Sequence, residues 1–445
     1  MSSKYIFSMH KVLITGIIEK ICDYMYDSSI IKLCKCSKYL KKYMHKNYKK
    51  EIYVKTTKSA NYYSSFLNAN LVVDINDTNI SNVDLNNFDN IVTLKLGGNV
   101  VITSDGIKNL NIKSLYLLNN TTITDDAFLK FTRLTNLVSK FNNITNDGLY
   151  NLTNLISLTL FSNNFITDDA FINLSNIEIL SLFDNKNVTD KIFDNLTELK
   201  SLELFYNKKI TDEGLKKLTN LTHLNLYFEN KITNNSLSSL TSLISLNLST
   251  NKNITDYGIK KLTGLTELDL SHNTKITNEG IIDLVNISSL DLSYNTNITS
   301  ILNFSRLTKL NLSRNYEIAD EMIQNLTNLK ILNLSYNNSI TNYGIIKLAE
   351  LQKLDLYKNN KITYHALTHL TNLLSLDLSF NSTITDDALK YLTKLQTLCL
   401  NNNQIISDDG IMHLTNLTKL YLIKNYDITD VSLTKLSNLS IIRSW

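Results

Sequence analysis

The hydrophobic positions of the chain alternate with polar ones in short runs. In the segment 265–273, "LTELDLSHN", Leu268 and Leu270 alternate with polar residues. A period of two predicts a short strand with one apolar and one polar face. The segment 276–284, "ITNEGIIDL", begins with the helix-capping residue Thr277 and brings apolar residues inward again. One strand followed by one short outer helix is therefore predicted for this unit.

The same unit recurs along most of the chain. Its marker is an isoleucine or valine, usually followed by threonine, with most steps 22 residues long: Ile80, Ile102, Ile123, Ile144, Ile166, Val188, Ile210, Ile232, Ile254, Ile276, Ile298, Ile318, Ile340, Ile362, Ile384, Ile406 and Ile428. Periods of this length are typical of stacked solenoids. One coil cannot bury its leucines alone, so we expect neighbouring strands to stack about 4.8 Å apart in a parallel sheet.

An asparagine follows most of the predicted strands. It stands at Asn273 and recurs at Asn251, Asn295, Asn315, Asn337, Asn359, Asn381, Asn403 and Asn425. An amide turned inward at this position can satisfy backbone groups of neighbouring coils. We therefore predict a buried, structural asparagine ladder.

The complete frame, L-x-x-L-x-L-x-x-N-x-x-I-T-[DN]-x-G, is clearest in residues 265–280. It resembles the leucine-rich repeat, in a variant close to the repeats of F-box leucine-rich-repeat proteins and of bacterial effectors like them. The resemblance covers about residues 70–442. It implies an α/β fold: a solenoid over residues 61–445 of about 16–17 repeats of 22 residues, with a curved parallel sheet inside and short helices outside.

Residues 1–60 follow a different pattern. Helical spacing of apolar residues predicts a first helix and then two more short helices after the turn at residues 27–29. This small helical domain is similar to the F-box: Leu13 matches its first position and Cys36-Ser37-Lys38 its valine-serine-lysine step. Ile14 and Gly16 stand where the F-box usually has proline and glutamate, and its usual late tryptophan is absent.

The F-box resemblance implies that residues 10–50 dock on the small acidic adaptor of a cullin-type ubiquitin ligase while the repeats hold the substrate. The docking residues would be Leu13, Ile17, Ile18, Ile21, Ile31, Leu33 and Ser37. The chain would then be a substrate-recruiting subunit. The alternative is a plain leucine-rich-repeat binding protein whose N-terminal helices only cap the first coil.

Charge is unevenly distributed along the chain. Residues 1–60 hold thirteen Lys or Arg against four Asp or Glu, a net charge of +9, which leaves −5 for the rest of a chain whose net charge is +4. A basic head suits an acidic partner. It could also meet nucleic acid or an anionic membrane, but its lysines lack interleaved arginines and a recognition helix, so we expect neither.

Cysteine usage and hydropathy bear on the compartment. Three of the four cysteines lie in the first forty residues, which is no disulfide framework and favours a reducing compartment. Neither a signal peptide nor a run of about 18 apolar residues is visible, so we expect a cytoplasmic or nuclear protein with no membrane span. The absence of proline, with many Asn, Lys, Ile and Tyr, is typical of an AT-rich genome such as those of some parasites and giant viruses.

Candidate metal and catalytic residues are few. His365 and His369 have the spacing of a zinc-protease helix, but Ala366 stands where that chemistry needs glutamate. Cys34 and Cys36 are separated by a single residue, whereas zinc loops place two to four residues between cysteines. With no phosphate loop, nucleophile elbow or catalytic acid pair visible, we expect no metal, no cofactor and no enzymatic activity.

The polar face of the strands carries the candidate binding site. The slot after the second leucine holds aromatic residues in four successive coils, Phe161, Phe183, Phe205 and Tyr227, and then serines at Ser249, Ser271, Ser293, Ser313 and Ser335. With Phe141, Tyr206 and Phe228 beside them, these rings are predicted to form a column that binds a protein partner. Alternatively, they merely cover the sheet or contact the N-terminal domain. The slot between the leucines becomes polar and partly acidic in the second half of the chain, and Glu229 interrupts the asparagine ladder.

Overall fold

A computed structural model describes residues 51–54, 70–75, 80–85, 90–98, 101–228 and 231–442. The seven predicted docking residues between Leu13 and Ser37, the cysteines near them and Glu229 lie outside these ranges. The described chain forms two compact units, which divide between Ile177 and Glu178.

The first unit is a parallel sheet backed by short helices. Its strands pair in chain order: β1 (Glu51–Val54), β2 (Asn70–Ile75), β3 (Ile91–Gly97), β4 (Ser114–Leu118), β5 (Asn136–Lys140) and β6 (Ser157–Phe161). Its helices are α5 (Asn82–Leu85), α6 (Ser104–Ile107), η1 (Asp125–Lys130), α7 (Asn146–Tyr150) and η2 (Asp168–Phe171). Every strand thus pairs with its neighbours in the sequence, as stacked coils require.

The second unit repeats this architecture. Its strands are β7 (Ile179–Phe183), β8 (Ser201–Phe205), β9 (His223–Asn225), β10 (Ser245–Asn247), β11 (Glu267–Asp269), β12 (Ser289–Asp291), β13 (Lys309–Asn311), β14 (Ile331–Asn333), β15 (Lys353–Asp355), β16 (Ser375–Asp377), β17 (Thr397–Cys399), β18 (Lys419–Tyr421) and β19 (Ser440–Ile442). They too pair in parallel and in chain order.

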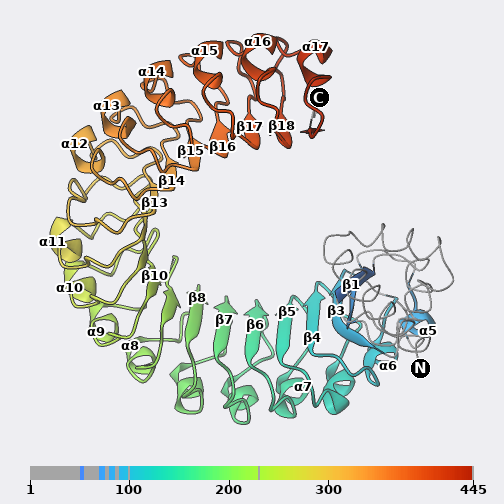
Figure 1. Ribbon diagram of the computed structural model, residues 1–445. Helices are drawn as coiled ribbons and strands as arrows, with labels where there is room; N and C mark the ends of the chain where they lie inside the picture. Colours follow the sequence, from blue (N-terminus) through green and yellow to red (C-terminus); the bar gives the residue numbers. More distant parts are fainter. Residues whose placement is uncertain are drawn as a thin grey trace, which may run out of the picture. The chain divides into compact units, whose positions relative to one another are not determined.

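Short helices follow the strands of the second unit: η3 (Asp190–Asp194), α8 (Asp212–Leu215), α9 (Asn234–Leu237), α10 (Asp256–Ile259), α11 (Asn278–Ile281), α12 (Asp320–Ile323), α13 (Asn342–Ile345), α14 (Tyr364–Leu367), α15 (Asp386–Leu389), α16 (Asp408–Ile411) and α17 (Asp430–Leu433). Within this unit the strands line the inner, concave side and the helices the outer side (Figure 1). The leucines of the frame, such as Leu268 and Leu270, are buried between the two layers. The predicted coil of strand and short helix is confirmed.

The predicted asparagine ladder is also confirmed. Asn273 is fully buried, and its Nδ2 donates to the carbonyl oxygens of Leu248 (3.2 Å) and Asn251 (3.1 Å) in the preceding coil. Its Oδ1 accepts from the backbone N–H groups of Lys275 (2.9 Å) and Ile276 (3.0 Å). One amide therefore satisfies two coils, which explains why a polar residue is tolerated inside the core.

A second strap ties the coils together on the helical side. The Oγ1 of Thr277 accepts from the N–H of Glu279 (3.3 Å), which confirms the predicted cap, and it donates to Oδ2 of Asp256 (2.8 Å) in the preceding coil. Oδ1 of Asp256 accepts the N–H of Thr277 (2.7 Å). A Cβ added to Gly280 would lie 2.4 Å from this Oδ1, so glycine permits the close approach of the two helices.

Strand length changes along the second unit for a local reason. Strands β7 and β8 are five residues long, whereas β9 to β18 are three residues long. In β8 the slot between the leucines is Glu203, but in β9 it is Asn225, whose Oδ1 accepts the N–H of Tyr227 (3.0 Å). In β9 to β16 an Asn or Asp in this slot accepts the backbone N–H two residues on and turns the chain early, whereas β17 and β18 carry Cys399 and Tyr421 there.

Candidate protein-binding surface

Five of the seven predicted aromatic residues gather on the second unit. We call Phe183, Phe205, Tyr206, Tyr227 and Phe228 the aromatic cluster. Phe205 is its centre: its ring centroid lies 6.0 Å from that of Phe183, 4.5 Å from Tyr206, 5.5 Å from Tyr227 and 6.2 Å from Phe228. Three successive coils therefore contribute to one continuous patch of rings.

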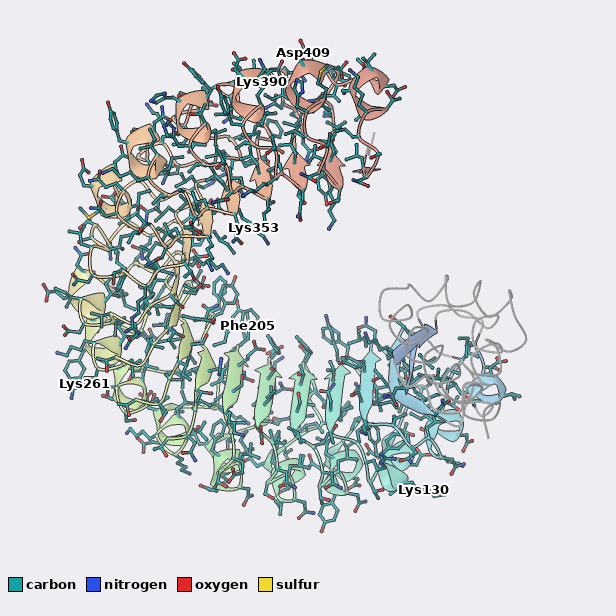
Figure 2. All side chains as sticks on the ribbon, in the orientation of Figure 1. Lys130, Phe205, Lys261, Lys353, Lys390 and Asp409 are labelled. Carbon is teal, nitrogen blue, oxygen red and sulfur yellow. The ribbon has the colours of Figure 1, made fainter. Side chains whose placement is uncertain are left out.

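The cluster is neither core nor a set of isolated exposed rings. Tyr206 keeps 45% of its surface exposed, and Tyr227 and Phe228 keep 37% each. Phe183 and Phe205 are half-buried, Phe205 being flanked by its neighbours. Phe205 extends from its strand away from the helical layer (Figure 2). The rings shield one another's flanks and present a shared outer surface.

The turn after each strand decides where two of these rings lie. Tyr206 (φ 56°) and Phe228 (φ 54°) adopt the left-handed backbone region, which costs a bulky residue roughly 1–2 kcal/mol. The same conformation is found in the residue before the ladder position of coil after coil, whatever its side chain: Asn119, Ser162, Asp184, Thr250, Arg314, Lys358, Asn402 and Lys424 are examples. The geometry of the coil therefore requires the left-handed backbone conformation at this position. The aromatic side chains of Tyr206 and Phe228 are not needed for it.

The two remaining predicted residues belong to the first unit. Phe141 is 51% exposed and Phe161 is half-buried, and Nζ of Lys140 lies 5.4 Å and 5.3 Å from their ring centroids. Phe161 occupies the predicted outward slot at the end of β6. Of the predicted column, the second unit brings together Phe183, Phe205 and Tyr227, and the first unit carries Phe161.

The polar residues between the two leucines of each strand, from Asn247 to Asp377, have a structural role that the sequence analysis did not predict. Oδ1 of Asp269 accepts the backbone N–H (2.9 Å) and the hydroxyl (2.6 Å) of Ser271. The equivalent residue accepts the N–H two positions on in seven successive coils, from Asn247 to Asp377. The main role of these residues is to end the strands, and their exposure on the polar face is a secondary feature.

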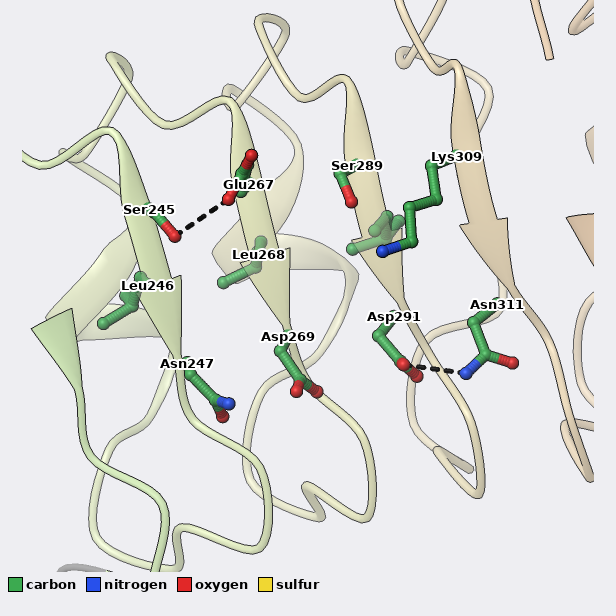
Figure 3. A pocket seen from close by; sticks show the side chains of 11 residues that line it. Ser245, Leu246, Asn247, Glu267, Leu268, Asp269, Ser289, Asp291, Lys309 and Asn311 are labelled. Carbon is green, nitrogen blue, oxygen red and sulfur yellow. Dashed lines mark hydrogen bonds between the residues drawn. The ribbon is translucent and has the colours of Figure 1, made fainter. Parts of the chain in front are cut away.

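A shallow depression of about 240 Å³ lies over these polar residues. Glu267, Asp269 and Asp291 line it together with Lys309 (Figure 3). Ser245 donates to Glu267 (3.1 Å) and Asn311 to Asp291 (2.7 Å), so neighbouring side chains occupy carboxylate oxygens. Burial raises the pKa of Asp269, the negative charge of Asp291 adds to this, and the hydrogen bonds from Ser271 oppose it.

Burial also controls the thiol on this face. Desolvation, with the negative charges of Asp377 and Asp355 beside it, raises the pKa of Cys399 to about 12. Such a thiol stays protonated at neutral pH and is a poor nucleophile.

Sequence reasoning missed a further row of side chains. His272, Tyr294, Arg314, Tyr336, Lys358 and Phe380 occupy the turn slot directly before the ladder asparagine in six successive coils. Period-two alternation describes strands and says nothing about this slot, so the row escaped notice. The available signal was the column itself: reading the residue before each ladder asparagine shows alternating aromatic and basic side chains.

Of the two histidines considered for zinc, His369 has its ring engaged with the backbone of His365. Nδ1 of His369 lies 3.1 Å from the carbonyl oxygen of His365 and 3.1 Å from Oγ1 of Thr368, an exposed helical arrangement. In the part of the chain that the structure describes, no group of three or more His, Cys, Asp or Glu side chains could hold a metal ion. Among the same residues, no helix has the length and apolar character to cross a membrane.

Comparison with known proteins supports the repeat. The profile of the leucine-rich repeat matches residues 195–218, 239–262, 263–285, 325–349, 369–392 and 391–414. No F-box is detected. No curated protein matches the chain.

Many solved structures share the fold. The mouse RP105/MD-1 complex matches with a TM-score of 0.55 at 24% identity, over 84% of this chain and 74% of that one. The TLR13–ssRNA13 complex matches with a TM-score of 0.53 at 22% identity, over 81% and 66%. An internalin from Listeria monocytogenes is 30% identical over 67% of this chain and 88% of its own, with a TM-score of 0.49. The repeat frame, the matched profile and the stacked coils agree: the chain is a leucine-rich-repeat protein.

Proposed function

We propose that the chain is a protein-binding scaffold and that the aromatic cluster is the centre of its binding surface. The observation that carries this proposal is a connected set of five rings around Phe205, of which three keep more than a third of their surface exposed. Contiguous exposed apolar patches mark interaction sites, and rigid aromatic anchors supply much of the binding energy at protein interfaces.

The alternative, that the rings only cover the sheet, is less well supported. Coils further along the same unit carry Ser249, Ser271 and Ser293 in the slot of Phe205, yet they keep the buried leucines and the asparagine ladder. The stack therefore does not need aromatic side chains there. Phe141 and Phe161 in the first unit extend the proposal to a second, smaller patch with Lys140 beside it.

The test compares two triple variants. Phe183→Ser, Phe205→Ser and Tyr227→Ser together should abolish capture of protein partners from lysate of the source cell, measured by quantitative mass spectrometry, with little change in the thermal midpoint. The control removes three exposed rings from the helical side, Tyr257→Ser, Tyr343→Ser and Tyr364→Ser. Unchanged capture by the cluster variant, or a large loss of its stability, would show that the rings only support the sheet.

A finer function is substrate recruitment for a cullin-type ubiquitin ligase. It is supported by the F-box-like pattern of residues 10–50, by their position ahead of the repeats and by the net charge of +9 in residues 1–60. We expect the full chain to co-purify with the acidic adaptor and the double variant Leu13→Asp, Ile17→Asp to lose it. Failure of the unmodified chain to bind the adaptor would leave the plain binding scaffold, whose capture of partners does not need the head.

A further inference from the structure

A second surface of the second unit combines rings and cations. The cationic row consists of His272, Tyr294, Arg314, Tyr336, Lys358 and Phe380, one from each of six successive coils, all with φ between 50° and 55°. It begins beyond the aromatic cluster, and one coil, which carries Ser249 and Thr250, separates the two.

The side chains of this row contact one another in series. The rings of His272 and Tyr294 stack with centroids 4.0 Å apart. The guanidinium carbon of Arg314 lies 5.2 Å from the ring of Tyr294 and 3.8 Å from that of Tyr336. Nζ of Lys358 lies 5.2 Å from the ring of Tyr336 and 4.7 Å from that of Phe380. Each cation is thus held between two aromatic residues.

The coils do not require this arrangement. The same turn slot holds Asp184, Thr250 and Asn402 elsewhere in the unit, with the same backbone conformation. The row is also accessible: Tyr294 is 40% and Phe380 39% exposed, while Arg314 and Lys358 are half-buried between the rings. Pre-ordering long basic side chains lowers the entropic cost of binding a ligand to them.

The geometry limits what can bind. The faces of the rings are already turned toward their neighbours in the row, so the row offers ligands the edge of the guanidinium, the ammonium group and the tyrosine hydroxyls. Nucleic-acid bases need free ring faces for stacking, so single-stranded nucleic acid is not favoured here. The edge of a guanidinium fits a carboxylate bidentately.

We propose that the cationic row binds an extended acidic segment of a protein partner, with one carboxylate on Arg314 and a second on Lys358. These two residues are two coils apart, which corresponds to about 10 Å at the usual strand spacing. An extended chain advances about 3.3 Å per residue, so acidic residues three positions apart would reach both cations. The proposal does not depend on what occupies the aromatic cluster.

Fluorescence anisotropy with a labelled synthetic peptide that carries glutamate at every third position tests this binding. Removing both charges, Arg314→Gln with Lys358→Gln, should weaken binding at least about tenfold, because the paired carboxylates lose their partners. The matched control, Lys309→Gln with Lys353→Gln, removes the same charge from the opposite end of strands β13 and β15 and should change binding less than about twofold.

Two further measurements, one with the Arg314→Lys variant and one with a lysine peptide, test whether binding depends on the guanidinium and on the charge of the peptide. Arg314→Lys keeps the charge but loses the fork, and it should bind with intermediate affinity in a chain of unchanged thermal midpoint. A peptide with lysine in place of glutamate should not bind. The proposal is overturned if the unmodified chain fails to bind the glutamate peptide, if both double variants lose binding equally, or if an oligothymidylate binds more tightly than the peptide. The aromatic-cluster variant should bind the peptide normally, which separates this result from the proposed function.

Discussion

At the scale of the residue, one amide or carboxylate decides how each coil is built. Asn273 joins two coils through four hydrogen bonds, and Asn225 ends β9 by accepting a single backbone N–H. Both tasks follow from the short side chains of Asn and Asp, which place polar atoms close to their own backbone. The buried ladder asparagine therefore joins neighbouring coils through hydrogen bonds to their backbones.

Replacing a ladder asparagine should be costly. Asn273→Ala leaves two carbonyl oxygens and two N–H groups without this partner in a buried site, so we expect a loss of roughly 3 kcal/mol or more in the free energy of unfolding. Urea unfolding measures it. The control is Asn286→Ala, whose exposed amide donates to one carbonyl oxygen, that of Thr263 (2.9 Å), and which should cost much less. Equal losses would contradict a structural ladder.

The raised pKa of Asp269 gives a prediction with a definite sign. Its pKa in the folded chain lies above the ordinary value of 3.8, chiefly because of burial, so the folded chain binds this proton more tightly than the unfolded chain does. The free energy of unfolding therefore falls as pH rises through that window. Asp269→Asn keeps a side-chain oxygen that accepts from Ser271, and it should raise the thermal midpoint at pH 7. This gain in the thermal midpoint should vanish at pH values below the ordinary pKa of 3.8, where the aspartate is neutral as well. A gain that is independent of pH would argue against buried charge as the cause.

At the scale of the element, the short helices are held by contacts that cross from coil to coil. The carboxylate of Asp256 bonds Thr277, and Gly280 leaves room for it. Four-residue helices cannot persist alone, since isolated helices of this length lack the hydrogen bonds to offset nucleation. The hydrogen bonds between Asp256 and Thr277 therefore stabilise short helices that local helix propensity alone would not stabilise.

Filling the space at this crossing should break the strap. Gly280→Val places a branched side chain where even a Cβ would lie 2.4 Å from Asp256, so we expect a loss of about 1–3 kcal/mol in the free energy of unfolding. Gly264→Ala is the control, because the nearest atom to its added Cβ is 3.4 Å away. Similar losses for both variants would mean that glycine matters only for local flexibility.

The elements were predictable to different degrees. The alternating leucines around Leu268 predict the strand, and the capping residue Thr277 predicts the start of the short helix. Because the same pattern recurs in coil after coil, each copy supports the prediction made from the others. The shortening of β9 was missed because it depends on the amide of Asn225 outcompeting a cross-strand bond. The cationic row was missed because positive φ at residues such as Arg314 sets the direction of the side chain, and the two-residue alternation within a strand does not describe that turn position.

At the scale of the whole molecule, the described strands pair only with neighbours in the sequence. Stability in such a stack is close to a sum of coil terms and neighbour terms. Damage in one coil should therefore stay local, unlike damage to a single shared core.

Hydrogen exchange can detect this locality. In the Asn273→Ala variant, amides of β10 and β11 should exchange faster, because the four lost bonds lie in their coils, while those of β17 and β18 should keep their protection. The readout is mass spectrometry of peptides from both regions. Uniform acceleration along residues 178–442 would show a single cooperative unit and contradict the additive picture.

The single coil between the two proposed surfaces, which carries Ser249 and Thr250, has an evolutionary consequence. Since Ser249 and its neighbours contribute the frame and little side-chain bulk, duplication or loss of one 22-residue coil there would move the cationic row relative to the aromatic cluster by one strand spacing, about 4.8 Å, and alter neither surface. Unequal recombination between near-identical repeats would then tune the distance between two docking sites in discrete steps, so that a family of such chains could match partners of different size with the same pair of contacts.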